Sequence, residues 1–461
     1  MSLGELIVDD LRCIEHAELL LHPGHNLIWG GNGSGKTSLL ESIFLLGRGR
    51  SFRTRNSERL IRHGRDRLVV FGRTLVGASD ERAGVSGGEG NAAGGVAFGD
   101  DSGRETEFGP RPHGSDVDDL QGGGETEGLS GFPGSPAGIA GGGSSALDEA
   151  PDDGGAGPAS RGRGAGRDMA DPRLHRREGW RNVGTTLGQP IGVQVSRVDG
   201  TIARISGSTA RSLTDLTQVF PVQIIDPGVH KLVEEGGHRR RRWMDWAVFH
   251  VEHQFGEWWM RYARILKQRN AALRTQPSQV TVWDAELARV GELISESRRR
   301  FVDTLLPYWR ESVLALSGLE PELHYFKGWA QDVTLAEALI ASKARDESKR
   351  ITHPGPHRAD VVIRMSGRPA REVLSRGQQK LVAVAMTLAQ LNLLQAATET
   401  TPTLLLDDPA AELDGEHLTR FIQQVMRLRS QLVLTSLHSE SHLFGTPNRV
   451  FHVEQGRVQP V

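Results

Sequence analysis

Apolar and polar positions follow three patterns along the chain. Before residue 78 and again over 176–235, short runs rich in Val and Ile, such as RLVVFGRTLVG and GQPIGVQVSRVDGTIARISG, predict strands. The Asp199-Gly200 pair in the second run predicts a two-residue hairpin turn. Over 236–345 apolar residues recur at three- and four-residue spacing, which predicts helices. Strand-like runs return after 346 in DVVIRM, TLLLDD and QLVLTS, so the chain is expected to fold as α/β.

The helical region is rich in large side chains. Aromatic residues at such a spacing pack into a core more often than they form a platform for stacking bases, and we expect a compact helical lobe. The recurring positions are Trp258, Tyr262, Ile265 and Leu266, followed by Trp283, Leu287, Val290, Ile294 and Phe301.

Composition separates one segment from the rest. Residues 78–170 hold 26 of the 56 glycines, with 17 acidic and 6 basic side chains. Such a segment cannot bury enough apolar surface to fold, so we expect a disordered acidic insertion over 78–175, in a loop between two strands. Because the whole chain has 57 acids and 55 bases, the remainder has 40 acids and 49 bases. That positive remainder suits a partner with a phosphate backbone.

Two further features point to the cytoplasm. The chain shows neither a run of about 18 apolar residues nor a secretory signal, so we expect a soluble protein without a membrane partner. Cys13 is the single cysteine, and its place beside an apolar strand predicts a small buried residue with no redox role.

The strongest motif is GGNGSGKT at Gly30–Thr37, a complete Walker A pattern between an apolar run and a helical one. Its glycines let backbone N–H groups surround phosphates, Lys36 can reach the β- and γ-phosphates, and the Thr37 hydroxyl can ligate Mg²⁺. ATP and Mg²⁺ are the expected cofactors. The expected nucleotide contacts are Gly30, Asn32, Gly33, Ser34, Gly35, Lys36, Thr37 and Ser38.

A Walker B pattern stands at Leu404–Asp408, an apolar strand that ends in two carboxylates. Asp407 would hold Mg²⁺ together with Thr37, and Asp408 would orient the attacking water. With Lys36, these two acids form the expected catalytic set. Because Asp408 is one methylene shorter than the Glu usual in ABC ATPases, slow hydrolysis is expected.

Three shorter stretches resemble motifs of ABC ATPases. LSRGQQK at Leu374–Lys380 is similar to the signature motif, in which Ser375, Gly377 and Gln378 would bind the γ-phosphate held by a second subunit. That resemblance implies an ATP-dependent homodimer. Glu412–Asp414 resembles the D-loop, while His438 and Gln223 are candidates for the switch histidine and the Q-loop glutamine.

These motifs divide the chain into an ATP-binding lobe and an inserted one. The P-loop ABC-type head would be a discontinuous lobe with a mixed sheet, formed first by 1–77 and 176–235 and completed by 346–461. A mainly helical second lobe over 236–345 would interrupt it.

Several stretches, in order, resemble the bacterial RecF family and together span nearly the whole chain outside the insertion. Arg240, Arg241 and Asp245 match that family's pattern in the second of them. The stretches are GHNLIWGGNGSGKTSLLESIFLLGRGRSFR, FPVQIIDPGVHKLVEEGGHRRRRWMDW, YARILKQRNAALR, THPGPHRAD, LSRGQQK and LLLDDPAAELD.

The resemblance implies a role in recombinational repair, replication-fork recovery and the SOS response. It implies an ATP-sandwich dimer that binds single- and double-stranded DNA at gaps, a weak DNA-stimulated ATPase activity, and help in loading RecA with RecO and RecR. Two alternatives stay open: the ATPase subunit of a transporter, and a scaffold that binds ATP but scarcely hydrolyses it.

Basic segments are the candidate DNA contacts. They are a loop with Arg48, Arg50, Arg53 and Arg55, and the run Arg239–Arg242, in which ion pairs with Asp245 or Glu235 compete with DNA contact. Pro356-His357-Arg358 is either structural or part of the ATP site.

Overall fold

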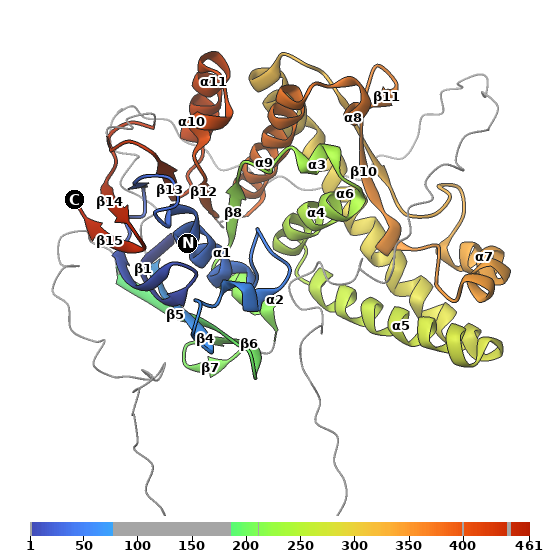
Figure 1. The fold of residues 1–461 in the computed structure, drawn as a ribbon. Coiled ribbons are helices and arrows are strands. Elements are labelled where there is room, and N and C mark those ends of the chain that lie inside the picture. The colour runs from blue at the N-terminus through green and yellow to red at the C-terminus, as the bar shows by residue number, and fades with distance from the viewer. Residues whose placement is uncertain (1, 77–185, 211, 399–400, 440–443) are drawn as a thin grey trace, which may run out of the picture.

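The fold consists of two six-stranded sheets on one side and a mainly helical lobe on the other (Figure 1). A computed structural model describes residues 2–76, 186–210, 212–398, 401–439 and 444–461. The segment expected to be disordered, 78–175, lies outside the described residues.

The first sheet is antiparallel throughout. β4 and β5 are neighbours in it, with Val76 opposite Thr186, so the last described residue before the expected insertion lies beside the first described residue after it. In sheet order its strands are β2 (Ile14–Leu20), β1 (Ser2–Leu11), β4 (Arg67–Val76), β5 (Thr186–Ser196), β6 (Gly200–Ile205) and β7 (Ser208–Thr209). The expected hairpin is present, but its turn has three residues, 197–199, because Ser196 pairs with Gly200 at φ 70°.

The second sheet is mixed, with a parallel centre and an antiparallel edge strand. Helix α1 (Lys36–Arg48) packs between the two sheets, and α2 (Leu213–Val219) packs on α1. In order the strands are β15 (Arg457–Pro460), β14 (Arg449–Glu454), β3 (His25–Trp29), β13 (Leu432–Ser436), β12 (Thr403–Leu406) and β8 (Val222–Ile225). Because β3, β13, β12 and β8 are parallel, their carboxyl ends meet at one edge.

The second lobe begins after β8. Its helices are α3 (Lys231–Glu234), α4 (Gly237–Val251), α5 (Phe255–Thr275), α6 (Asp284–Ser317), α7 (Leu335–Lys349), α8 (Ala370–Val373) and α9 (Arg376–Ala397). Short 3₁₀ turns are η5 (Pro277–Trp283) and η6 (Pro356–Arg358) here, and η1 (Ser57–Leu60) after α1. Beyond β12 come α10 (Pro409–Glu412) and α11 (Gly415–Met426).

One strand lies elsewhere than the sequence indicates. DVVIRM, expected in the returning ATP-binding lobe after 346, is β10 (Asp360–Met365), which pairs with β9 (Glu322–Phe326) and β11 (Arg368–Pro369) in a separate small sheet. The chain rejoins the second large sheet only at β12. A strand-like run does not reveal which neighbour it pairs with, and here that neighbour follows α6 in the second lobe.

The recurring apolar positions of the helical region do pack into a core. Tyr262 and Phe301 are buried there, whereas Trp258 and Trp283 are half-buried and pack against its edge. α9 also packs along α6. Within the described part of the chain, α9 is the single helix long and apolar enough to cross a bilayer, yet 72% of its apolar window is buried inside the protein.

The expectation that Cys13 is buried is wrong. It lies in the turn between β1 and β2, and its side chain is exposed instead of buried. Strand alternation points the flanking Leu11 and Ile14 inward, and the tight turn leaves Cys13 outside. Its Sγ lies 3.9 Å from the Ser38 Oγ of α1.

Candidate functional site

The Walker A segment forms a loop between β3 and α1, as the motif predicts. Gly30, Gly33 and Gly35 have φ values of 156°, 76° and 118°, which side chains with a Cβ rarely adopt. At Gly30 an added Cβ would also lie 2.2 Å from the carbonyl oxygen of Val453 in β14. Glycine is therefore required there by both conformation and space.

The loop presents its polar groups as a phosphate cradle. Lys36 Nζ donates hydrogen bonds to the carbonyl oxygens of Gly30 at 2.7 Å and Gly31 at 2.9 Å. Ser34 Oγ is buried and has no hydrogen-bond partner among the described residues. Burial lowers the pKa of Lys36, and the nearby carboxylates of Asp408 and Asp407 oppose that shift. A buried cation and an unused hydroxyl at the start of a helix fit the phosphates of a nucleotide.

Asp407 and Thr37 meet directly although they lie far apart in the sequence. Thr37 Oγ1 donates to both carboxylate oxygens of Asp407, at 3.1 Å each. The hydroxyl and the carboxylate are oxygen ligands of the kind that Mg²⁺ prefers, so they could hold a hydrated magnesium ion with the phosphates. Ser38 is another of the expected nucleotide contacts, and its side chain is buried in the first turn of α1.

Thr435, at the end of β13, links the two acids. Its Oγ1 donates to Asp407 Oδ1 at 2.9 Å and accepts the backbone N–H of Asp408 at 2.9 Å. The backbone of Asp408 has the left-handed conformation, with φ 47° and ψ 59°. This conformation costs a non-glycine residue on the order of 1 kcal/mol or more. The sequence alone does not indicate a role for Thr435, although it lies in the first strand after Walker B.

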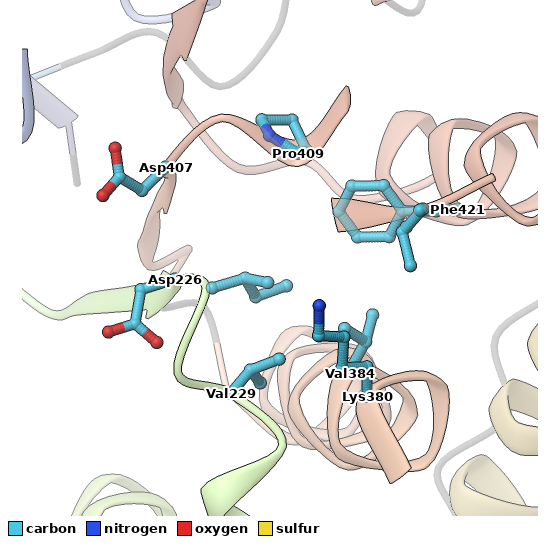
Figure 2. A pocket seen from close by; sticks show the side chains of 9 residues that line it. Asp226, Val229, Lys380, Val384, Asp407, Pro409 and Phe421 are labelled. Atoms are coloured by element: carbon cyan, nitrogen blue, oxygen red, sulfur yellow. The ribbon is translucent and has the colours of Figure 1, made fainter. Parts of the chain in front are cut away.

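Asp226 is the other residue that sequence reasoning missed. With Asp407 it lines a cavity of about 20 Å³ between β8, β12 and α9, and Figure 2 shows both carboxylates on one side of it. Burial raises the pKa of Asp226, and the charge of Asp407 raises it further. The signal was available in FPVQIIDP, where an acid follows a buried strand.

Gln223 is not placed as a Q-loop residue. Its side chain is buried within β8, where Oε1 accepts from Arg48 at 2.9 Å and Nε2 donates to Gln390 at 2.7 Å. Both ends of the amide are thus used in the core. His438 lies exposed in the loop after β13, where its backbone N–H donates to Ser436 Oγ at 3.2 Å.

The signature residues lie on the second lobe, apart from the Walker A loop of the same chain (Figure 1). Ser375 is the N-cap of α9, and it forms a capping box in which the Gln378 backbone N–H donates to Ser375 Oγ at 3.3 Å. Ser375 and Gly377 are exposed. In the D-loop, Asp414 caps α11 by accepting from the His417 backbone at 3.1 Å.

The prediction that Arg48 contacts DNA is wrong. It is buried on α1, with Nε bonded to the Val222 carbonyl at 3.0 Å and its guanidinium 4.6 Å from the ring of Trp246. The sequence does not show that Trp246 of α4 packs against Arg48. Burial, with the charge of neighbouring Arg242, lowers the pKa of Arg50 to about 10, whereas Arg53 and Arg55 are exposed.

The run Arg239–Arg242 is largely engaged within the second lobe. Arg239 pairs with Glu235, one of the two acids expected to compete for this run, and Arg240 pairs with Asp360 at 2.8 Å. Arg241 donates to the Ala359 carbonyl at 2.7 Å.

Pro356 and His357, for which the sequence leaves two interpretations open, make structural contacts in the second lobe, whereas Arg358 is exposed. His357 Nδ1 lies 2.8 Å from Tyr262 Oη, and its Nε2 lies 3.1 Å from the Thr352 carbonyl. Arg298 donates to the Pro356 carbonyl at 2.6 Å. These contacts anchor Pro356 and His357 within the second lobe.

Together the Walker A loop, the Walker B acids and the two-lobed fold define an ABC-type ATPase head. Residues 2–84 and 185–459 match the family model of the RecF/RecN/SMC N terminal domain. The chain belongs to the RecF family, and the expected family and fold class are confirmed.

Similar proteins span the full length. The DNA replication and repair protein RecF of Shewanella woodyi is 30% identical over 464 residues, covering 99% of this chain and 98% of that protein. RecF of Vibrio atlanticus is 29% identical over 464 residues and covers 100% and 99%. The solved structure of the recombination mediator protein RecF-ATP in the RecFOR pathway superimposes with a TM-score of 0.69, at 19% identity, over 100% of this chain and 97% of that one.

Proposed function

We propose that this protein is an ATP-dependent DNA-binding switch of recombinational repair, a dimer that closes on two ATP molecules and opens after slow hydrolysis. The observation that carries the proposal is the arrangement around Asp407, where the Walker A threonine and the Walker B acid are in hydrogen-bond contact. A family that includes DNA replication and repair proteins supports the DNA-binding role over that of a transporter subunit.

Each residue of the site has a distinct role in this proposal. The N–H groups of Gly33 to Thr37 would bind the phosphates, and Lys36, which contacts the Gly30 and Gly31 carbonyls here, would bind the β- and γ-phosphates. Thr37 and Asp407 would hold Mg²⁺, whose charge would offset the negative charge of the phosphates. Asp408 orients the attacking water, and its short side chain is consistent with slow turnover.

The position of the signature motif supports the proposed dimer. Ser375, Gly377 and Gln378 stand at an exposed start of the 22-residue helix α9, on a different lobe from the Walker A loop. A helix start of this kind attracts negative charge. A second copy would bring its signature helix to the γ-phosphate bound by the first, which completes two composite sites by symmetry.

Gly377→Asp tests the composite site. Space is open at Gly377, where the nearest atom to an added Cβ is Ser375 Oγ at 4.0 Å, and an acid in the first turn of a helix favours folding. The new carboxylate would repel the partner's γ-phosphate. We expect unchanged ATP binding and loss of ATP-dependent dimers in analytical ultracentrifugation.

In a mixture of Gly377→Asp and Lys36→Met proteins, the Walker A loop of the first variant can face the signature motif of the second. One composite site is then intact, so we expect the mixture to form heterodimers. If Gly377→Asp alone dimerises with ATP as well as the wild type does, the sandwich arrangement is incorrect.

The basic loop after α1 is the proposed DNA contact. Ser51 holds this loop to the buried Glu41 of α1, and its Oγ accepts the backbone N–H groups of Arg53 at 2.9 Å and Thr54 at 3.0 Å. The loop that displays Arg53 and Arg55 is therefore attached to the Walker A helix. This attachment offers a route by which nucleotide binding affects DNA binding.

Replacing both Arg53 and Arg55 by Ala is expected to weaken binding to gapped duplex DNA on the order of tenfold. It should also reduce the dependence of log K on log salt by about two, since two phosphate contacts are lost. Fluorescence anisotropy over a salt series measures both quantities. An unchanged salt slope would place the DNA on another surface. Arg59→Ala, an exposed change just beyond the loop, serves as the control.

The remaining partners are proposed from the family. We propose that the protein acts in the cytoplasm, with RecO and RecR, to help load RecA at gaps, and that DNA stimulates its weak ATPase activity. The RecF of the similar ATP-bound structure acts in the RecFOR pathway, and this supports these partners.

A further inference from the structure

Asp226 stands at the point where the chain leaves the sheet for the second lobe. β8 pairs in parallel with β12, with Ile225 opposite Leu406, and the backbone N–H of Asp407 donates to the Ile225 carbonyl at 3.0 Å. The residues that follow this pair, Asp226 and Asp407, therefore emerge at the same edge. Their proximity is fixed by strand register and does not depend on a flexible loop.

The two carboxylates also face the same way. Both line the cavity beside α9, and Figure 2 shows them projecting to one side of it, away from Phe421 and Val384. Asp407 accepts a hydrogen bond from Thr37 Oγ1 of the Walker A helix. Asp226 thus adds a second carboxylate near the place where the metal of a bound nucleotide would lie.

Positive charge near Asp226 comes from the second lobe. Lys231 of α3 and Arg239 of α4 act on it from that side, and the backbone N–H of Gly228 donates a hydrogen bond to its side chain. Arg239 is itself paired with Glu235. Two carboxylates held close together repel one another unless a cation lies between or beside them. Hydrated Mg²⁺ meets this need, because it keeps several waters and is held in proteins by one or two carboxylates together with phosphates.

We propose that Asp226 is an additional carboxylate of the magnesium–nucleotide site, where it accepts a hydrogen bond from a water of the hydrated metal ion. The inference rests on the proposed function, since it requires that the Walker A loop bind a nucleotide with Mg²⁺. It assigns to Asp226 a positioning role, because the residue acts on the phosphates through the metal and its water. A cap for the turn at Gly228 is the structural alternative.

The test is the magnesium dependence of nucleotide binding, measured with a fluorescent, non-hydrolysable ATP analogue. Wild-type protein and Asp226→Asn are titrated with the analogue in EDTA and at a series of Mg²⁺ concentrations. Mg²⁺ should raise the affinity for the analogue above its value in EDTA. We expect Asp226→Asn to need on the order of tenfold more Mg²⁺ than the wild type to reach half of that rise. Its affinity in EDTA should be equal to that of the wild type or higher, because one negative charge near the phosphates is lost.

Two further variants separate the metal from folding and from charge alone. Glu234→Gln removes the same charge from an exposed position at the end of α3, and its Mg²⁺ midpoint should match that of the wild type. Asp226→Ser removes the carboxylate with a smaller side chain and should repeat the Mg²⁺ shift. Thermal unfolding of each variant without nucleotide reports on a structural role.

The outcomes are distinct. The proposal is overturned if Asp226→Asn reaches half of the rise in affinity at the same Mg²⁺ concentration as the wild type. It is also overturned if this variant loses affinity equally in EDTA and in Mg²⁺, which would indicate that Asp226 only caps the turn. If wild-type protein binds no analogue at any Mg²⁺ concentration, the proposed function fails together with the inference. If wild-type protein binds and only the Asp226 variants behave unexpectedly, the inference alone fails.

Discussion

Lys36→Met is expected to abolish measurable ATP binding, with a loss of affinity on the order of a hundredfold or more. The side chain of Lys36 is buried, and its ammonium group is held at the mouth of the Walker A loop by two carbonyl oxygens. Methionine keeps the length of the side chain but removes the charge that would meet the phosphates. Isothermal titration calorimetry with ATP and Mg²⁺ measures the loss directly.

Lys267→Met is the matched control, because Lys267 is exposed on α5 in the second lobe. It should bind ATP as the wild type does. Since dimerisation depends on bound nucleotide, Lys36→Met should also remain monomeric in ATP. Persistent ATP-dependent dimers of this variant would contradict the sandwich mechanism.

Arg298→Met is expected to produce the largest loss of stability, about 3–5 kcal/mol. Arg298 is fully buried and pairs with Asp245 through Nε at 2.7 Å and Nη2 at 2.9 Å. It also donates to the Pro356 carbonyl and stacks 5.1 Å from the ring of Trp259. Removing the arginine leaves the Asp245 carboxylate buried without its cation, which is the costly part of the change. Urea unfolding followed by tryptophan fluorescence measures the free energy.

The neighbouring residue provides the control. Arg299 pairs with Glu296 at 2.7 Å and Asp303 at 3.0 Å, but its side chain is 56% exposed. Arg299→Met should therefore cost less than about 1 kcal/mol. Replacing both members of the buried pair, as Arg298→Met with Asp245→Leu, should recover much of the loss because no charge is left buried. If Arg298→Met and Arg299→Met lower the free energy of unfolding equally, the buried pair is no more important for stability than the exposed one.

The parts of the site that are contiguous in sequence could be predicted, because their spacing fixes their geometry. Gly30–Thr37 needs only a strand before it and a helix after it to form a phosphate loop, and β3 and α1 provide both. Asp407 follows a buried strand and could be assigned in the same way. The family could be inferred because these stretches keep their order along nearly the whole chain.

Residues whose surroundings come from distant segments could not be predicted. Asp226 lies near Asp407 only because β8 and β12 pair. Thr435 contacts Asp407 and the backbone of Asp408 only because β13 is the other neighbour of β12. Arg48 was misjudged because Trp246, on a helix nearly two hundred positions later, covers it. DVVIRM carried a clear strand pattern, but the identity of its partner strand is a tertiary property that the local sequence does not contain.

ATP-dependent DNA binding is best tested with gapped duplex DNA, with and without ATP and over a salt series. We expect wild-type protein to bind tightly in ATP and its affinity to fall steeply with added salt, because the contacts are to phosphates. Lys36→Met should lose the ATP-dependent part of this binding. No binding with or without ATP, by protein shown to bind ATP, would contradict the account and favour a scaffold that depends on another partner.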